Sequence, residues 1–173
     1  MDDDDLMLPN RLEVQLAAAT KDCGGTYGGW IDYHIDTGEL DYHPAKQHSF
    51  ESILFSGKVL IHPAMMIRRK LLEKFRYDER FKYGTDWLMN MSVVSSGVQF
   101  RHCGQYLIVR RMHGRNVTTT DTDEQKTTAR TMQSTIIDDL GPSNVSRMRK
   151  VGKASTPIDL SLIHISEPTR RYR

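Results

Sequence analysis

The chain opens with MDDDDLMLPNRLEVQ (residues 1–15), in which four consecutive aspartates precede a proline and a helix-like pattern. If this stretch is extended, Asp2 and Asp4 point the same way, because successive side chains of a strand alternate between its two faces. Such a carboxylate pair suits Mg²⁺ or Mn²⁺, which take oxygen ligands and let substrate phosphates complete the shell. On composition alone, a solvated acidic end is the commoner explanation. A protease-tag remnant is disfavoured, because Leu6 stands where such a tag carries lysine.

Length and composition indicate one domain or part of one. The 173 residues, 38% of them hydrophobic, can bury a single core. No run of roughly 18 apolar residues suggests a membrane span, and no charged-then-apolar start suggests a secretion signal. Cys23 and Cys103 lie far apart without a metal-ligand spacing. We therefore expect free thiols in a reducing compartment.

The end of the chain distorts the charge balance. The stretch LSLIHISEPTR (residues 160–170) resembles the translation of a transposase-type sequencing adapter, and we exclude residues 160–173 from structural reasoning. These residues hold three arginines and one glutamate, a net charge of +2, which equals the formal charge of the whole chain. Because the remainder is neutral and nucleic-acid binding needs a basic face, we expect no nucleic-acid partner.

Helical and extended patterns follow one another along the chain, which predicts an α/β fold. Helices are expected where apolar residues recur at helical spacing or where capping residues flank a short run, at residues 9–20, 49–57, 68–75, 85–96 and 123–140. Thr85 is the expected cap of the fourth helix. Extended segments are expected at residues 23–43 (a hairpin turning at Thr37-Gly38), 58–67 (broken at Pro63), 98–103 and 106–113. A doubly wound nucleotide-binding sheet normally opens with strand, glycine-rich turn and helix, so the order looks incomplete at its start.

Three blocks of the sequence, in this order along the chain, together carry a resemblance to a known family. They are the opening DDDDLMLPNRL, then IHPAMMIRRKLLEKFRYDERFKYGTDWLM (residues 61–89), then LIVRRMHGRNVT (residues 107–118). They resemble, respectively, the D-x-D-D-x-x-x-P-x-R-L segment, the acceptor-side block and the Y-R-x-H-x-x-x-x-S/T ending of family 2 glycosyltransferases with the GT-A fold. The resemblance implies the C-terminal portion of a GT-A (nucleotide-diphospho-sugar transferase) fold, with a mixed sheet flanked by helices.

The same resemblance assigns roles to five residues. Asp2 and Asp4 would hold Mg²⁺ or Mn²⁺ against the diphosphate of a nucleotide-sugar donor, and Asp86 would deprotonate the acceptor hydroxyl. His113 would approach the metal or the diphosphate, with Arg111 beside it. The implied activity is metal-dependent, inverting transfer of a sugar to a glycan or lipid-linked acceptor, because one base and one displacement invert the anomeric centre. The Q-x-x-R-W signature of polymerising members is absent, which favours a single addition.

The sequence also departs from the family pattern. Thr85 stands where glutamate is common, and Phe75-Arg76 replaces the usual Gly-Gly. The first strands of the family, which grip the nucleoside, have no counterpart, so we expect a truncated enzyme with little or no activity alone. The expected organisation is the metal-binding and acceptor half of a GT-A domain, a C-terminal helix, a linker or disordered tail, and a non-native tail, at residues 1–120, 121–142, 143–159 and 160–173. The expected location is cytoplasmic, with peripheral association at the cytoplasmic face of a membrane allowed.

Each assignment has a structural alternative. Without the resemblance, the commoner role of Asp86 in a first helical turn is to complement the helix dipole, and lone histidines such as His113 are usually surface residues. Trp30 and Trp87 are more commonly packed than stacked on sugars. The methionines at positions 65, 66, 89 and 91 are most simply core residues. Asn116-Val-Thr and Asn144-Val-Ser match the glycosylation pattern, and without a secretion signal we interpret both as chance matches.

Two other classes of function stay open at the level of sequence. The first is a non-catalytic interaction module whose acidic start is a solvated tail. The second is a glycoside hydrolase, which needs two carboxyl groups roughly 5 to 9.5 Å apart around the scissile bond.

Overall fold

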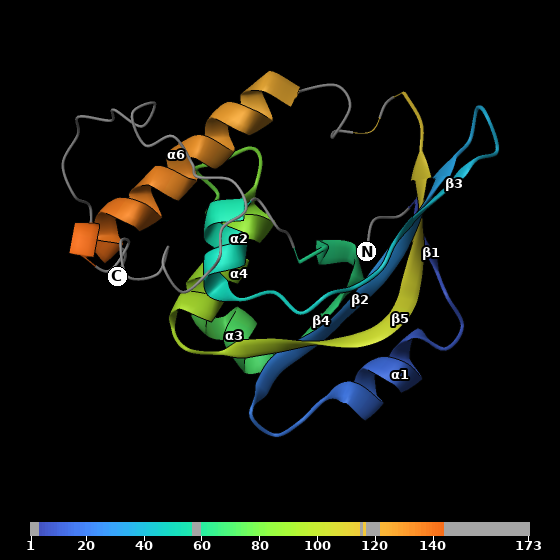
Figure 1. The fold of residues 1–173 in the computed structure, drawn as a ribbon, viewed down its shortest axis with the longest axis horizontal. Coiled ribbons are helices and arrows are strands. Elements are labelled where there is room, and N and C mark those ends of the chain that lie inside the picture. Colours follow the sequence, from blue (N-terminus) through green and yellow to red (C-terminus); the bar gives the residue numbers. More distant parts are fainter. Residues whose placement is uncertain (1–3, 57–59, 115, 117–121, 144–173) are drawn as a thin grey trace.

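A computed structural model describes residues 4–56, 60–114, 116 and 122–143. They form one mixed sheet flanked by helices, which confirms the predicted fold class (Figure 1). The strands are β1 (Leu6–Met7), β2 (Cys23–His34), β3 (Leu40–His43), β4 (Met65–Ile67) and β5 (Gln99–Met112). The helices are α1 (Arg11–Ala18), α2 (Phe50–Ser56), the 3-10 turn η1 (His62–Ala64), α3 (Arg69–Lys74), α4 (Thr85–Ser95) and α6 (Thr122–Leu140).

Strand β2 is the centre of the sheet, whose order is β1-β5-β2-β3. The long strand β5 runs parallel to β2 along one edge, from Cys23 opposite Gln99 to His34 opposite Met112. The other edge of β2 is shared by two antiparallel strands, β4 beside residues 25–27 and β3 beside residues 30–33. The hairpin between β2 and β3 turns at Gly38, whose positive φ of 76° favours glycine, as predicted for this turn.

Glycines let neighbouring elements approach β2 closely. A Cβ at Gly25 would lie 2.2 Å from the carbonyl oxygen of Met66 in β4, and one at Gly28 would lie 2.3 Å from the side chain of Leu107 in β5. Both separations are far below van der Waals contact. The glycine-rich sequence of β2 is therefore required by a strand that is paired along both edges.

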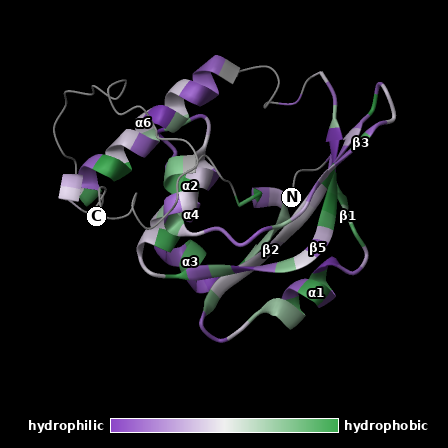
Figure 2. Ribbon diagram, viewed as in Figure 1, coloured by the Kyte–Doolittle hydropathy of each residue, from purple (hydrophilic) through white to green (hydrophobic). Residues whose placement is uncertain are grey.

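Helix α1 packs against β2 and β5 with its polar side inward. Arg11 donates to the carbonyl of Met65 (3.1 Å), and Gln15 donates to the carbonyls of Thr26 (3.1 Å) and Ala64 (3.2 Å). Unsatisfied buried carbonyls are costly, which explains why buried polar side chains face them. Two leucines of the same helix point outward instead, Leu12 at 55% and Leu16 at 63% exposure. The helix was predicted at residues 9–20 and spans Arg11–Ala18, but its buried residues, Arg11 and Gln15, are polar. Figure 2 shows both hydrophilic and hydrophobic residues along α1.

The main hydrophobic core lies between the sheet and the helices on its other side. Residues of β2 and β5 meet α2, α4 and α6 there, among them Tyr27, Leu54, Met89, Phe100 and Ile137. Three of the four methionines expected in the core are buried, and Met66 is half-buried. Residues 143–159 and 160–173, expected to be tails, lie outside the described residues except for Ser143.

Two local predictions need correction, and a third is confirmed. The segments 98–103 and 106–113 are one strand, because β5 takes extra residues opposite β2 near Gly104, whose φ of 71° accommodates the irregularity. The N-cap of α4 is Gly84, in the left-handed conformation, and Thr85 is the first helical residue. The break predicted at Pro63 within residues 58–67 is confirmed, because η1 (His62–Ala64) interrupts the segment before β4.

As predicted, Cys23 and Cys103 are both free thiols. Within the described ranges, we find no helix with the length and apolar character needed to cross a membrane.

Candidate functional site

The end of β5 brings the start of the chain next to residues more than 100 positions away. Strand β1 pairs antiparallel with β5, Leu6 opposite Val109 and Met7 opposite Ile108. Because Asp4 lies two positions before Leu6, this register places it at the C-terminal end of β5. There the guanidinium Nε of Arg111 donates to the main-chain carbonyl of Asp4.

Asp4 and His113 form the central contact of this candidate site. His113 Nε2 lies 3.1 Å from Asp4 Oδ2, and the two side chains are 31% and 36% exposed, respectively. The hydrogen bond with His113 lowers the pKa of the Asp4 carboxyl below its usual 3.8; burial opposes this shift, and the charge of Arg111 adds to it. The structure thus presents an ionised carboxylate and an imidazole nitrogen side by side, both reachable by solvent.

This pair offers two donor types that divalent metals take, a carboxylate oxygen and an imidazole nitrogen. In the structure these two atoms are hydrogen-bonded to each other at 3.1 Å, so a metal that bound both would replace that hydrogen bond; adjacent ligands of an octahedral ion with bonds of about 2.1 Å lie a similar distance apart, about 3.0 Å. Carboxylate oxygen is a preferred ligand of Mg²⁺ and Mn²⁺. Among the residues that the structure describes, no three His, Cys, Asp or Glu side chains gather as a metal site. Asp2, the other predicted ligand, lies outside the described residues, so the described chain offers two donors, and other ligands have to complete the shell.

Asp86, the predicted base, lies in the first turn of α4. Its negative charge, together with the larger effect of burial, raises the pKa of Tyr77. The Tyr77 hydroxyl lies 3.1 Å from His62 Nε2, and the two rings meet edge to face. Asp86 has no hydrogen bond or ion pair with Asp4 or His113. The structure therefore brings Asp4, Arg111 and His113 together and leaves Asp86 on another element, beside Tyr77.

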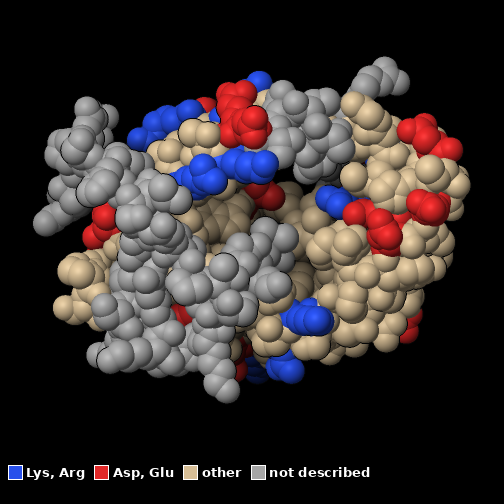
Figure 3. All heavy atoms as spheres, turned by 45° about the horizontal axis from the view of Figure 1, so that its top comes forward, with Lys and Arg blue, Asp and Glu red and all other residues tan. Residues whose placement is uncertain are grey.

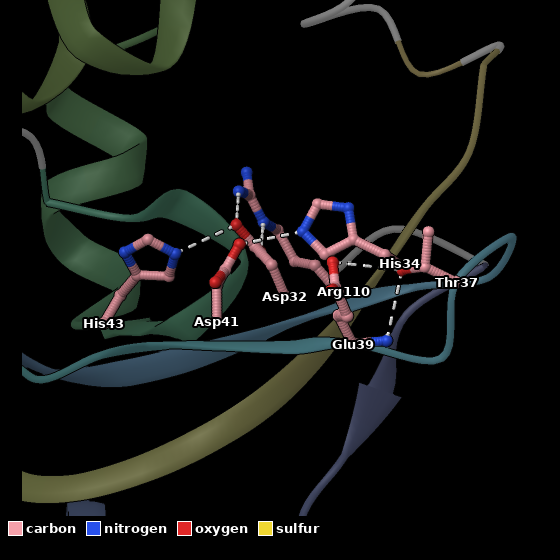
Figure 4. Close-up of polar contacts among 7 residues, drawn as sticks. All are labelled: Asp32, His34, Thr37, Glu39, Asp41, His43 and Arg110. Carbon is pink, nitrogen blue, oxygen red and sulfur yellow. Dashed lines mark hydrogen bonds and ion pairs between the residues drawn. The ribbon is translucent and has the colours of Figure 1, made fainter.

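A second polar cluster, which the sequence did not reveal, lies on β2, β3 and β5. Asp32 binds both Nε and Nη2 of Arg110, at 2.7 and 2.8 Å, and His43 Nε2 lies 3.1 Å from Asp32 (Figure 4). Burial opposes ionisation of Asp32, but the hydrogen bond and charge of Arg110, with the charge of His43, lower its pKa overall. Arg110 precedes Arg111 in β5, so this cluster anchors the strand that carries the Asp4 contacts.

The same cluster includes an aromatic stack. The rings of Trp30 and His43 lie 4.6 Å apart and 12° from parallel, and the Arg110 guanidinium lies 5.7 Å from the Trp30 ring. Trp30 is half-buried and packed, as expected. No sequence pattern marks Asp32 or Arg110, because their pairing depends on the register between two parallel strands.

Two cavities adjoin β2, since Tyr27 lines both. One of about 570 Å³ is lined by residues of α2, α4 and the start of β5, and one of about 260 Å³ by residues of β2, β3 and the segment after β3. Neither is lined by Asp4, Asp86 or His113. Figure 3 shows a hollow in one face of the molecule, with acidic and basic side chains interspersed around it.

The chain is similar to an uncharacterized glycosyltransferase of Methanocaldococcus jannaschii. The two are 26% identical over 123 residues, which cover 67% of this chain and 42% of the relative. The chain thus spans less than half of the length of that relative. No family model matches the sequence.

Proposed function

We propose that the chain is the metal-binding and acceptor half of a GT-A-type glycosyltransferase of family 2. Its parent enzyme would transfer a sugar from a nucleotide-sugar donor to a glycan or lipid-linked acceptor, with inversion and with Mg²⁺ or Mn²⁺ bound. The observation that carries the proposal is the Asp4–His113 contact. The resemblance assigned these two residues, 109 positions apart, to one site. The similarity to a protein named as a glycosyltransferase supports the same class.

The residues have separate tasks in this proposal. Asp4 and His113, with Asp2, would hold the metal, which when bound would offset charge on the departing nucleoside diphosphate. The cationic Arg111, which keeps Asp4 in place, would add positive charge near the diphosphate. Asp86 would accept the proton of the acceptor hydroxyl as its oxygen bonds to the anomeric carbon and the bond to the diphosphate breaks. Asp86 lies on α4, and the Asp4–His113 pair lies at the end of β5. A bound acceptor would therefore have to reach from one to the other.

Mn²⁺ titration tests the proposal on the full chain. We expect Mn²⁺ with a nucleoside diphosphate to bind the wild type, and binding to be lost in Asp2→Ala/Asp4→Ala and weakened at least tenfold in His113→Ala. Asp139→Ala, which removes an exposed carboxylate from α6, serves as the matched control and should bind normally. Identical titration curves for all variants would favour a non-catalytic interaction module. Release of free sugar from a glycan without any nucleotide donor would favour a glycoside hydrolase.

A further inference from the structure

Asn116 holds the two residues that contact Asp4. Its side-chain Nδ2 donates to the main-chain carbonyl of Arg111 at 3.1 Å, and its Oδ1 accepts a hydrogen bond from the main-chain N–H of His113. Its own main-chain N–H donates to the carbonyl of His113 at 3.1 Å. One half-buried asparagine therefore makes three hydrogen bonds to the backbone at the end of β5.

These contacts help to set the distance between Asp4 and His113, the two proposed metal donors. The Arg111 side chain holds the main chain of Asp4, and the His113 side chain meets the Asp4 carboxylate. Both side chains leave the backbone at points that Asn116 fixes. The ladder of β5 with β2 ends at His34 opposite Met112, one residue before His113. An Asn side chain suits this place, because it offers both a donor and an acceptor to the backbone.

We infer that Asn116 is a positioning residue, which orients Arg111 and His113 so that both meet Asp4. The inference rests on the proposed function, since it gives the Asp4–His113 pair its role toward a divalent metal. It also reinterprets the Asn116-Val-Thr tripeptide. The amide nitrogen that glycosylation would modify is used in the fold as a donor to Arg111.

The test compares four variants of the full chain by Mn²⁺ binding, with and without inorganic pyrophosphate, and by backbone amide exchange. Asn116→Ala should weaken Mn²⁺ binding about three- to tenfold, the range expected for losing one or two hydrogen bonds. It should also speed exchange of the His113 amide by a similar factor. Asn10→Ala is the matched control, because Asn10 is exposed and its side chain makes no capping hydrogen bond to α1. It should leave both measurements unchanged.

A second variant separates the two side-chain contacts. Asn116→Asp keeps the acceptor for the His113 N–H and loses the donor to Arg111. Exchange of the His113 amide should therefore stay near the wild-type rate. Exchange that is accelerated in Asn116→Asp would overturn the assigned contact, and this readout decides the matter even if Asn116→Ala fails to fold.

His113→Ala distinguishes failure of this inference from failure of the proposed function. If His113→Ala weakens Mn²⁺ binding and Asn116→Ala does not, the positioning role is wrong and the proposed function stands. If His113→Ala binds Mn²⁺ like the wild type, the role of His113 in the proposed function is wrong, and the positioning role is overturned with it.

Discussion

The carboxylate of Asp32 and the guanidinium of Arg110 form a two-point ion pair between parallel strands. Both oxygens of Asp32 are used, at 2.7 and 2.8 Å, and the Asp32 side chain is only 9% exposed. Planar two-point pairs of this kind are the strong form of a charged hydrogen bond. The pair joins β5 to β2 one residue before Arg111, so its removal should lower stability.

Replacing one partner of this pair should be strongly destabilising. Asp32→Ala leaves the Arg110 charge largely buried without a partner, so we expect the free energy of unfolding to fall by about 3–5 kcal/mol. Urea unfolding measures the change. Arg69→Ala is the control, since it breaks the exposed Arg69–Glu73 pair within α3 and should cost under about 1 kcal/mol. Equal effects of the two substitutions would contradict this account.

The lowered pKa of Asp32 should appear in the pH dependence of stability. A carboxyl group whose pKa is lower in the folded chain stabilises it above the unfolded pKa, and this contribution is lost as pH falls through the folded pKa. The free energy of unfolding should therefore fall as the pH drops below about 4. Asp32→Asn should make that fall shallower, measured by urea unfolding at a series of pH values. An unchanged slope would show that Asp32 titrates normally.

The inward polar face of α1 gives a counterintuitive prediction. Gln15→Ala removes the donor to the buried carbonyls of Thr26 and Ala64, so we expect a loss of about 1–3 kcal/mol in the free energy of unfolding. Leu16→Ala, one position along the same helix, removes a mostly exposed side chain and should change it by under about 0.5 kcal/mol. The two variants are compared by urea unfolding. A larger loss from the leucine would mean that α1 docks through its apolar side.

Close packing at Gly28 predicts a different kind of loss. Gly28→Ala places a methyl group against Leu107 and 2.7 Å from the carbonyl oxygen of Gln105, which should cost about 1–3 kcal/mol of stability. Gly114→Ala is matched to it, since a Cβ there would meet nothing within 4 Å. Thermal unfolding of the two variants should differ by several degrees. A Gly28→Ala protein as stable as the wild type would show that β5 can shift away from β2.

Helices were predictable from the sequence to within a few residues, because periodicity and end signals are local. The β2–β3 hairpin was also predictable, but the pairing of strands distant in the sequence was not. Asp32 and Arg110 are 78 positions apart, and only the parallel register of β2 and β5 makes them partners. Which face of α1 is buried was also not predictable. The apolar spacing of Leu12 and Leu16 located the helix, but the side that packs on the sheet is the polar one, because its side chains donate to buried main-chain carbonyls.

The candidate site was predictable only in part, and through resemblance rather than through spacing. Asp4 and His113 were assigned to one site from the order of three blocks, and they are in contact. Asn116 was noticed only as part of a glycosylation pattern, because its hydrogen bonds go to backbone atoms and no residue pattern announces them. Asp86 was assigned as the base through the same resemblance, although Thr85 stands where glutamate is common, and the resemblance says nothing about which side chains surround it.

The surroundings of Asp86 give the last prediction. Burial raises the pKa of Tyr77, and the charge of Asp86 adds to that shift. Asp86→Asn removes the charge and keeps the shape, so the pKa of Tyr77 should fall but stay above its usual 10.0, because burial remains. NMR titration of the tyrosine ring carbons measures this. The pKa of Tyr27, raised to about 12 by burial, should be unaffected and serves as the internal control. A Tyr77 pKa that does not respond would mean that Asp86 is not an ionised neighbour of Tyr77, which would weaken its assignment as the base in this part of the fold.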